Sequence, residues 1–405
     1  MTSNNIRKFC MCCLNKNLVE ILDLGSHSFA DRFIPKKFIN KQEDKYPLIL
    51  QLCKKCKFIQ SKIITKPSER YSVFEYSYTS SNSNYAKNHW KKFSNFLEKK
   101  IQIKNKKIIE IGSNDGFLSN ILREKGAKVL CVDASKFMTN LSKKKKLKSI
   151  NLVFDYKNSK KIKKNFGIAD IIIANNVFNH SNNPVDFIEG IKNLLDDKKG
   201  IFIFEQPNFF TGVMMDKYDQ IYHEHISYFT ATNIKNFIEL NGLSVIEMTK
   251  NPYHGGSLRT IASISRKQSP KNFFKYLKEE KQNKIYNISF YKKMMKRISL
   301  KKNVINDKIS QFKEKGYKVV GIGAGAKCNT FLTFNELNNK KIDFITDSSV
   351  FKQDKYTPIT KIVIKDDQEL KKFQKVACII LIWNISKFVI KKIKSLNKNI
   401  KFIKI

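Results

Sequence analysis

Histidine is the residue type that points most directly to chemistry in this chain, because there are only six and they are unevenly placed. Two lie in the segment Tyr222-His223-Glu224-His225, a third is His180, and a fourth, His254, opens a His-Gly-Gly-Ser segment. Imidazole can take up and release a proton near neutral pH, and a neighbouring hydroxyl or carboxylate can polarise or orient it. A buried structural pair and a metal site are the alternatives, but two histidines ligate a metal poorly without a third. We favour catalysis.

The cysteines are concentrated at the start of the chain. Five of the eight lie in the first 56 residues, as Cys10-Met11-Cys12-Cys13 and Cys53-Lys54-Lys55-Cys56. Two C-x-x-C pairs predict a zinc ion held by four thiolates, Cys10, Cys13, Cys53 and Cys56, with Cys12 left over. Such a site is closed and therefore structural. Buried or reactive thiols without a metal are the alternative.

Residues 107–133 show the pattern of a strand, a glycine turn, a helix and a second strand. The predicted strand 107–111 leads into Gly112-Ser113-Asn114-Asp115-Gly116, the predicted helix covers 117–125, and a second strand ends at Asp133. This pattern opens a doubly wound α/β sheet, in which a nucleotide-like ligand lies over the strand ends.

The glycine turn favours S-adenosylmethionine (SAM) over a dinucleotide. The dinucleotide signature G-x-G-x-x-G is absent, and Asp133 follows Gly112 by 21 residues, where its carboxylate can accept hydrogen bonds from a ribose diol. An ordinary glycine turn is the alternative.

Further predicted strands at 169–174 and 200–204 would bring the residues that follow them to the same edge of the sheet: Asn175, Asn176, His180 and Glu205. Asp155 either faces the adenine or is a surface acid. The predicted cofactor-binding residues are Glu110, Gly112, Asn114, Asp115, Gly116, Asp133, Asp155, Asn175 and Asn176.

The last third of the chain predicts a second α/β unit. A strand at 317–321 leads into a glycine turn at 323–325, and Lys327 and Asn329 follow where a helix should begin. A helix N-terminus with a lysine can hold a phosphate, so these residues are candidate substrate ligands. A purely structural lid is the alternative.

The charge of the chain is strongly positive but does not by itself indicate nucleic-acid binding. There are 77 basic and 35 acidic residues, a net charge of +42, yet the basic residues are almost all lysine and are spread over the chain. Proteins that recognise nucleic-acid sequences rely on arginine for bidentate contacts, so we interpret the excess of lysine as compositional bias on solvated faces. The polar start and the absence of a long apolar run predict a cytoplasmic protein without a membrane partner.

Several segments together resemble the SAM-dependent sugar C-methyltransferases that act on nucleotide-activated 4-keto-deoxysugars. The Tyr-His-Glu-His and His-Gly-Gly-Ser segments are the most specific part of this resemblance. The matching segments are the four predicted zinc ligands, Leu22–Gly25, Glu75–Ser81, Glu110–Gly116, Ile221–Phe229, His254–Arg259 and Gly321–Thr330. Asp31, Cys328 and Ile359 depart from the family pattern.

The resemblance implies roles for particular residues. His225 would be the general base with Tyr222 and Glu224 as its partners, and Tyr76 and His180 would contact the sugar. The implied substrate-binding residues are His254, Gly255, Gly256, Ser257, Arg259, Lys327 and Asn329.

The resemblance also implies an architecture and an activity. We expect a zinc-binding domain (1–70), a class I methyltransferase domain with a Rossmann-like α/β sheet (71–245) and a C-terminal Rossmann-like domain (246–405), in a monomer or homodimer. The expected reaction removes the proton from carbon 3 of a nucleotide-linked 4-keto-6-deoxysugar and methylates that carbon. The alternatives are O- or N-methylation of a related nucleotide sugar and, with less support, zinc-dependent nucleic-acid binding.

Overall fold

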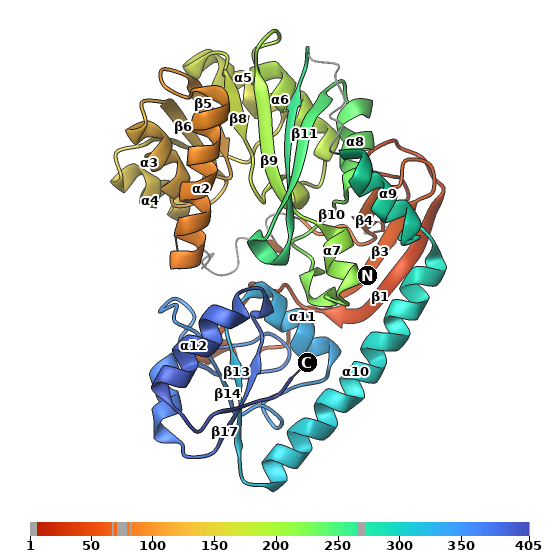
Figure 1. Cartoon of the computed structure of the whole chain (residues 1–405), viewed down its shortest axis with the longest axis vertical. Helices are drawn as coiled ribbons and strands as arrows, with labels where there is room; N and C mark the ends of the chain where they lie inside the picture. Colours follow the sequence, from red (N-terminus) through yellow and green to blue (C-terminus); the bar gives the residue numbers. More distant parts are fainter. Residues whose placement is uncertain (1–5, 67–68, 71–78, 82, 266–272, 405) are drawn as a thin grey trace.

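The computed structural model describes residues 6–404 except for 67–68, 71–78, 82 and 266–272. Four sheets, of seven, five, four and two strands, organise the described residues. In Figure 1 the seven-stranded sheet and its helices form the upper part, the five-stranded sheet forms the lower part, and the N-terminal strands lie to the right of both.

The seven-stranded sheet is mostly parallel, with an antiparallel hairpin at one edge. The predicted strands at 107–111, 127–132, 169–174 and 200–204 all form, with small shifts at their ends. Their apolar residues are buried on both faces, as is typical of a parallel sheet covered by helices. The strand order is β11 (Ser244–Asn251), β12 (Ser257–Ser263), β9 (Ile201–Pro207), β8 (Ile171–Ile173), β5 (Lys107–Ile111), β6 (Lys128–Asp133) and β7 (Lys148–Asn151).

Helices cover both faces of this sheet. On one face Trp90, Phe93 and Leu122 pack against the strands, and on the other face Phe187 and Phe237 do so. Side-chain caps start several of these helices, so their first turns are fixed by the sequence itself. The helices are α2 (Asn84–Ile101), α3 (Phe117–Glu124), α4 (Lys136–Lys144), α5 (Tyr156–Phe166), α6 (Pro184–Leu194) and α8 (Ala231–Leu240).

The N-terminal module is a small antiparallel sheet that borrows a strand from later in the chain. Its order is β1 (Leu18–His27), β3 (Tyr46–Cys53), β4 (Ile59–Ser61) and β10 (Ser227–Tyr228). Because β10 directly follows the Tyr222–His225 segment, the pairing of Tyr228 with Ile59 ties that segment to this module.

The C-terminal part is a five-stranded parallel sheet reached through a long helix. Figure 1 shows α10 (Ile288–Glu314) running along the outside of the molecule between the two larger sheets, after the shorter α9 (Phe274–Gln282). The predicted strand and glycine turn at 317–325 form and lead into α11 (Ala326–Phe334). The strand order is β16 (Ile364–Lys365), β14 (Phe344–Thr346), β13 (Lys318–Ile322), β17 (Val376–Ile380) and β18 (Lys401–Phe402), with α12 (Ser386–Leu396) after β17.

Two features modify the predicted organisation. The predicted boundary at residue 246 falls inside β11, and the seven-stranded sheet runs on to Ser263. A two-stranded sheet of β2 (Ile34–Pro35) and β15 (Lys355–Tyr356) joins the N-terminal module to the C-terminal part. Among the described residues no helix combines the length and apolar character that crossing a bilayer requires.

Candidate active site

A cavity of about 500 Å³ lies over the carboxyl ends of β5, β6 and β8. The glycine turn after β5 forms its floor: Gly112 adopts a φ of 68°, and its N–H donates to Val132 at 2.7 Å. Asp133 holds the turn, because its carboxylate accepts the backbone N–H groups of Asn114 and Ser135, each at 2.8 Å. This is the position at which doubly wound sheets bind nucleotide-like ligands.

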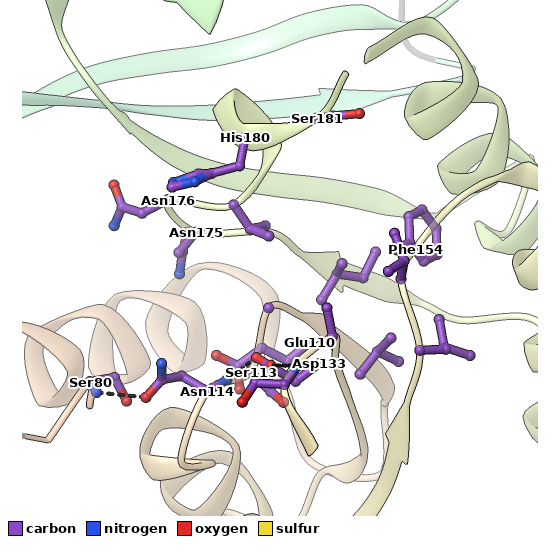
Figure 2. Close-up of a pocket in the computed structure, with 18 of the residues that line it drawn as sticks. Ser80, Glu110, Ser113, Asn114, Asp133, Phe154, Asn175, Asn176, His180 and Ser181 are labelled. Carbon is purple, nitrogen blue, oxygen red and sulfur yellow. Dashed lines mark hydrogen bonds between the residues drawn. The ribbon is translucent and has the colours of Figure 1, made fainter. Parts of the chain in front are cut away.

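The opposite wall carries polar atoms without a hydrogen-bond partner in the part of the chain that the structure describes. Figure 2 shows Asn175, Asn176 and His180 facing Glu110, Ser113 and Asp133 across the cavity. Asn175 accepts the N–H of Glu205 at 2.9 Å, but its side-chain N–H group has no hydrogen-bond partner among the described residues, and neither has the side-chain oxygen of Asn176. Buried polar atoms are normally hydrogen-bonded, so these two atoms fit a ligand in the cavity.

Buried carboxylates gather at one end of the cavity. Burial raises the pKa of Glu110 to about 8, with Asp115 and Asp133 adding like-charge repulsion, and burial likewise raises the pKa of Asp133. Removal from water disfavours an uncompensated negative charge. The site therefore suits a ligand that brings a positive charge and hydroxyl donors, as SAM does with its sulfonium and ribose.

His225 is buried next to His180, which lines this cavity, and is held by both ring nitrogens. Nδ1 lies 3.1 Å from the carbonyl oxygen of Gln220, and Nε2 lies 2.7 Å from the hydroxyl of Tyr222. A carbonyl can only accept, so Nδ1 carries the proton, and the lone pair of Nε2 accepts the hydrogen bond from the Tyr222 hydroxyl. Burial first, and then the proximity of His180 and Lys327, hold the pKa of His225 well below its usual value, so the ring is neutral.

The structure assigns the orienting role to a group other than the one the sequence suggested. We expected Glu224 to orient His225, but its carboxylate turns away and accepts the backbone N–H of Asp31 at 3.1 Å. The Gln220 carbonyl orients the imidazole instead. Residues 222–225 form a turn in which the His225 N–H donates to the Tyr222 carbonyl at 3.0 Å. The side chains at the two ends of the turn, Tyr222 and His225, therefore meet, whereas Glu224 inside the turn lies against Asp31. His223 likewise points away, with Nε2 3.2 Å from the carbonyl of Pro47.

His180 connects the base to the cavity wall. Its ring lies perpendicular to that of His225, with centroids 5.1 Å apart, and it lines the cavity. Burial, followed by the charge of Arg70, lowers the pKa of His180 to about 3. Arg70 donates to the His180 carbonyl at 3.2 Å and also lines the cavity. The structure thus brings His180, His225 and Tyr222 together; Tyr76 lies outside the described residues.

The four predicted zinc ligands converge. The sulfur atoms of Cys10, Cys13, Cys53 and Cys56 all lie within 4.8 Å of one another, with 3.4 Å between Cys10 and Cys56 and 3.7 Å between Cys13 and Cys53. A tetrahedral zinc with bonds of about 2.3 Å separates its sulfurs by about 3.8 Å, so the cluster fits the ion. All four positions are filled by thiolates, which makes the site structural.

Three predicted cofactor ligands have other roles. Asp115 does not line the cavity; its carboxylate accepts the hydroxyls of Ser80 and Ser81 and so fixes the start of α2. Asp155 caps α5, accepting the N–H of Asn158 at 2.6 Å, and is likewise absent from the lining. Gly116 is needed for packing, because a Cβ there would lie 2.6 Å from Leu147.

Several predicted substrate ligands are also used within the protein. Arg259 and Glu205 sit opposite each other on β12 and β9 and form a buried ion pair at 2.6 Å beneath α2, with His89 bonded to the same carboxylate. Ser257 donates to the Tyr253 carbonyl at 2.9 Å, and the amide of Asn329 donates to the carbonyl of Ala30. These side chains point into the fold because the strands and α11 bury them.

The His-Gly-Gly-Ser segment forms the β11–β12 turn against the C-terminal part. A Cβ at Gly255 would lie 2.2 Å from Trp383, and one at Gly256 would lie 2.8 Å from Thr211, so both glycines permit close packing. His254 does line the cavity. Lys327, at the N-terminus of α11, donates to the His254 carbonyl at 3.1 Å and remains near the base.

Sequence reasoning missed three groups at this site. Phe154 contributes an aromatic wall to the cavity, visible in Figure 2, and it directly precedes Asp155, a predicted cofactor ligand. Arg70 could not be found because its relation to His180 spans 110 residues. The Gln220 carbonyl carries no side-chain signal at all.

The doubly wound sheet, its glycine turn and the acidic cavity define a class I methyltransferase. Three family models match the chain in order: "Putative zinc binding domain" over residues 10–71, "Methyltransferase domain" over 83–248 and "C-methyltransferase C-terminal domain" over 252–405. The protein is a SAM-dependent methyltransferase with a structural zinc module.

The chain is similar along nearly its whole length to the C-methyltransferase NovU of Streptomyces niveus. The two are 23% identical over 393 residues, which cover 96% of this chain and 93% of the relative. Similar solved structures include the magnesium protoporphyrin IX methyltransferase of Synechocystis PCC 6803 with bound SAH (16% identity, 44% of this chain and 82% of that one, TM-score 0.35). Another is a SAM-dependent methyltransferase of Clostridium acetobutylicum (14% identity, 46% and 94%, TM-score 0.37). The fold assignment rests on the strand order and the family models.

Proposed function

We propose that this methyltransferase transfers its methyl group to carbon 3 of a nucleotide-linked 4-keto-6-deoxysugar, with His225 as the base. The observation that carries the proposal is the setting of His225: Nδ1 lies 3.1 Å from the Gln220 carbonyl, which requires the proton on Nδ1, and Nε2 lies 2.7 Å from the Tyr222 hydroxyl. An oxygen or nitrogen already carries the lone pair that accepts the methyl group and needs no C–H base, whereas a carbon beside a ketone must first lose its proton. The match of residues 252–405 to a domain described for C-methyltransferases supports the same choice.

The residues present supply the steps that such a reaction requires. Nε2 of His225 takes the proton from the carbon beside the ketone, and the electron pair of that C–H bond moves toward the ketone oxygen. The Tyr222 hydroxyl, which donates to Nε2 in this structure, can turn to the ketone oxygen when Nε2 takes the proton, and there it stabilises the developing oxyanion. When bound, SAM supplies an electrophilic methyl group to the carbon, and the bond from methyl to sulfur breaks.

The polar walls of the cavity suggest where the cofactor lies. We propose that Asp133 and Glu110 bind its ribose end and that Asn175 and Asn176 use their unpartnered atoms to hold the remainder. His180 then lies between the cofactor and His225, on the side from which a sugar must approach. Holding two reactants in contact contributes as much as about 7–11 kcal/mol in favourable cases.

Lys327 is the proposed contact for the diphosphate of the substrate. It lies in the first turn of α11, where the helix dipole also favours an anion. Burial lowers its pKa to about 8, and a phosphate nearby would restore the charged form. The substrate would then lie where the seven-stranded sheet and α11 meet.

The test is hydrogen exchange at the carbon beside the ketone. A nucleotide-linked 4-keto-6-deoxysugar is incubated with the enzyme in D₂O, and NMR follows loss of the carbon 3 proton, first without SAM and then with it. We expect exchange and carbon methylation with the wild type, and a loss of about 100-fold or more in His225→Gln. Methylation at oxygen or nitrogen without exchange would overturn the proposal.

A matched control is available two residues away. His223 is equally buried but faces Pro47, so His223→Gln should keep exchange within a few-fold of the wild type. Because the pKa of His225 is lowered, the base stays neutral through the physiological range, and the exchange rate should fall only as the pH drops below 6.5. An acidic limb centred above pH 7 would contradict this assignment.

A further inference from the structure

The orientation of the base depends on a backbone carbonyl, which must itself be held in place. The Gln220 carbonyl belongs to a 3₁₀ turn, Tyr218–Gln220, between α7 (Phe209–Met214) and the histidine segment. If this carbonyl moves away, Nδ1 loses its acceptor, and the ring can place its proton on Nε2 instead. That tautomer has no lone pair at Nε2 and cannot act as the base there.

Among the described residues, three side chains of the C-terminal part donate hydrogen bonds to this turn or to Ile221, the residue that follows it. Thr330 on α11 donates its hydroxyl to the carbonyl of Ile221 at 2.9 Å. The amide of Asn335, just after α11, donates to the Tyr218 hydroxyl at 2.6 Å, and the indole N–H of Trp383 donates to Asp219 at 2.6 Å.

The residues that make these contacts are buried except for Trp383, which is half-buried, and this burial limits the access of water. Tyr218, Asp219, Thr330 and Asn335 are each less than a tenth exposed, and each contact joins residues more than 100 positions apart. A buried acceptor that loses its donor pays the full cost of desolvation, so the turn would rearrange rather than keep the carbonyl where it is.

The other end of the histidine segment is held independently. The Ile226 N–H donates to Asn179 at 2.8 Å, and the Ile226 carbonyl accepts from Ser61 of the zinc module at 2.8 Å. The position of the His225 backbone is therefore secured by β10 and its neighbours. What remains for the C-terminal contacts is the orienting carbonyl on the other side of the ring.

We propose that Thr330, Asn335 and Trp383 are positioning residues that hold the Gln220 carbonyl and thereby select the Nδ1–H tautomer of His225. This inference rests on the proposed role of His225 as the base. It gives the C-terminal part a function in the proton transfer itself, in addition to any contact with the substrate.

The decisive variant is Thr330→Val, which keeps the shape of the side chain and removes the donor. We expect the rate of hydrogen exchange and kcat to fall about 10-fold or more, with the KM for the sugar and the affinity for SAM within a few-fold of the wild type. Thr330→Ser, which keeps the hydroxyl, should restore most of the rate. Tyr218→Phe removes a second contact and should give a smaller loss.

A direct readout separates positioning from general loss of structure. With ¹⁵N-labelled histidine, the ring nitrogen shifts report the tautomer of His225, assigned by comparison with His225→Gln. We expect the Nδ1–H form in the wild type and in Thr330→Ser, and a shift toward the Nε2–H form in Thr330→Val. Thr357→Val is the control: its hydroxyl is also buried in the C-terminal part and contacts Thr360, far along the chain from this turn.

The outcomes are distinct. An unchanged tautomer and an unchanged exchange rate in folded Thr330→Val overturn the inference, as does an equal effect of Thr357→Val. If His225→Gln keeps full exchange, the proposed function fails, whereas the tautomer of His225 still shows whether the C-terminal contacts position the ring.

Discussion

The chain uses one backbone arrangement twice, at the glycine turn after β5 and at the glycine turn after β13. In both turns a left-handed glycine, Gly112 or Gly323, donates its N–H at 2.7 Å to the residue before an acid. In both, that acid, Asp133 or Asp347, accepts two backbone N–H groups at 2.8 Å, one from the turn and one from beyond its own strand.

The two turns differ in what surrounds this common frame. Two residues before the glycine, the first has the buried acid Glu110, and the second has Gly321. A Cβ at Gly321 would lie 2.7 Å from Leu381 and 2.9 Å from Ile345, so aliphatic side chains fill the space that a polar group occupies in the first turn. The same backbone thus supports a ligand cavity in one sheet and a packed contact in the other.

The largest expected effect comes from closing the first turn. Gly112→Ala places a Cβ about 2.7 Å from Val177 on a backbone with positive φ, so the turn must shift. Such overpacking costs about 1–3 kcal/mol, and we expect at least about 10-fold weaker SAM binding by calorimetry. Gly323→Ala meets Ile382 in the same way and should lower the melting temperature but leave SAM affinity unchanged.

Equal losses of SAM affinity in Gly112→Ala and Gly323→Ala would break the comparison. So would a calorimetric stoichiometry of two SAM molecules per chain, because the second turn would then be a binding site as well.

The paired aspartates give a smaller contrast. Asp133→Asn weakens two charge-assisted hydrogen bonds that hold the cavity floor, and a loss of about 1.5 kcal/mol corresponds to roughly 10-fold in affinity for SAM. Asp347→Asn weakens the equivalent bonds of the second turn and should change only the unfolding midpoint. A loss of SAM binding in Asp347→Asn would show that the two turns are coupled.

The smallest effect is a pH dependence that only the first turn should have. The pKa of Glu110 is about 8 in the folded protein because of burial, well above the 4.5 of a free glutamate. The folded state therefore holds a proton that the unfolded state releases, and stability falls as the pH rises from about 4.5 to 8. Glu110→Gln removes this slope. In urea unfolding of the SAM-free protein, the free energy of unfolding of Glu110→Gln should therefore exceed that of the wild type by an amount that grows with pH. A difference that stays constant with pH would contradict the assignment.

Much of the fold could be predicted from local sequence. Buried strands such as Ile171–Ile173 are continuous apolar runs, and glycine turns and helix caps mark the ends of elements within a few residues. The zinc cluster was predictable for the same reason, since two C-x-x-C pairs need only one close approach to complete four ligands. Residues 244–263 were harder, because an edge hairpin can extend either neighbouring domain, and its pairing with β9 is decided by long-range hydrogen bonds.

The candidate site shows the same division. Proton transfer and a nucleotide-like cofactor could be predicted from sequence alone, on the residue types at His225, Tyr222, Gly112 and Asp133. The chemistry of a side chain and the conformational freedom of a glycine are properties of the residue type and need no tertiary information. Tertiary structure alone decided that Gln220, rather than Glu224, orients the base, and that Arg259 forms an ion pair with Glu205 inside the sheet. These outcomes depend on which side of a strand or turn a group faces and on partners up to 193 residues away, and the local sequence pattern specifies neither.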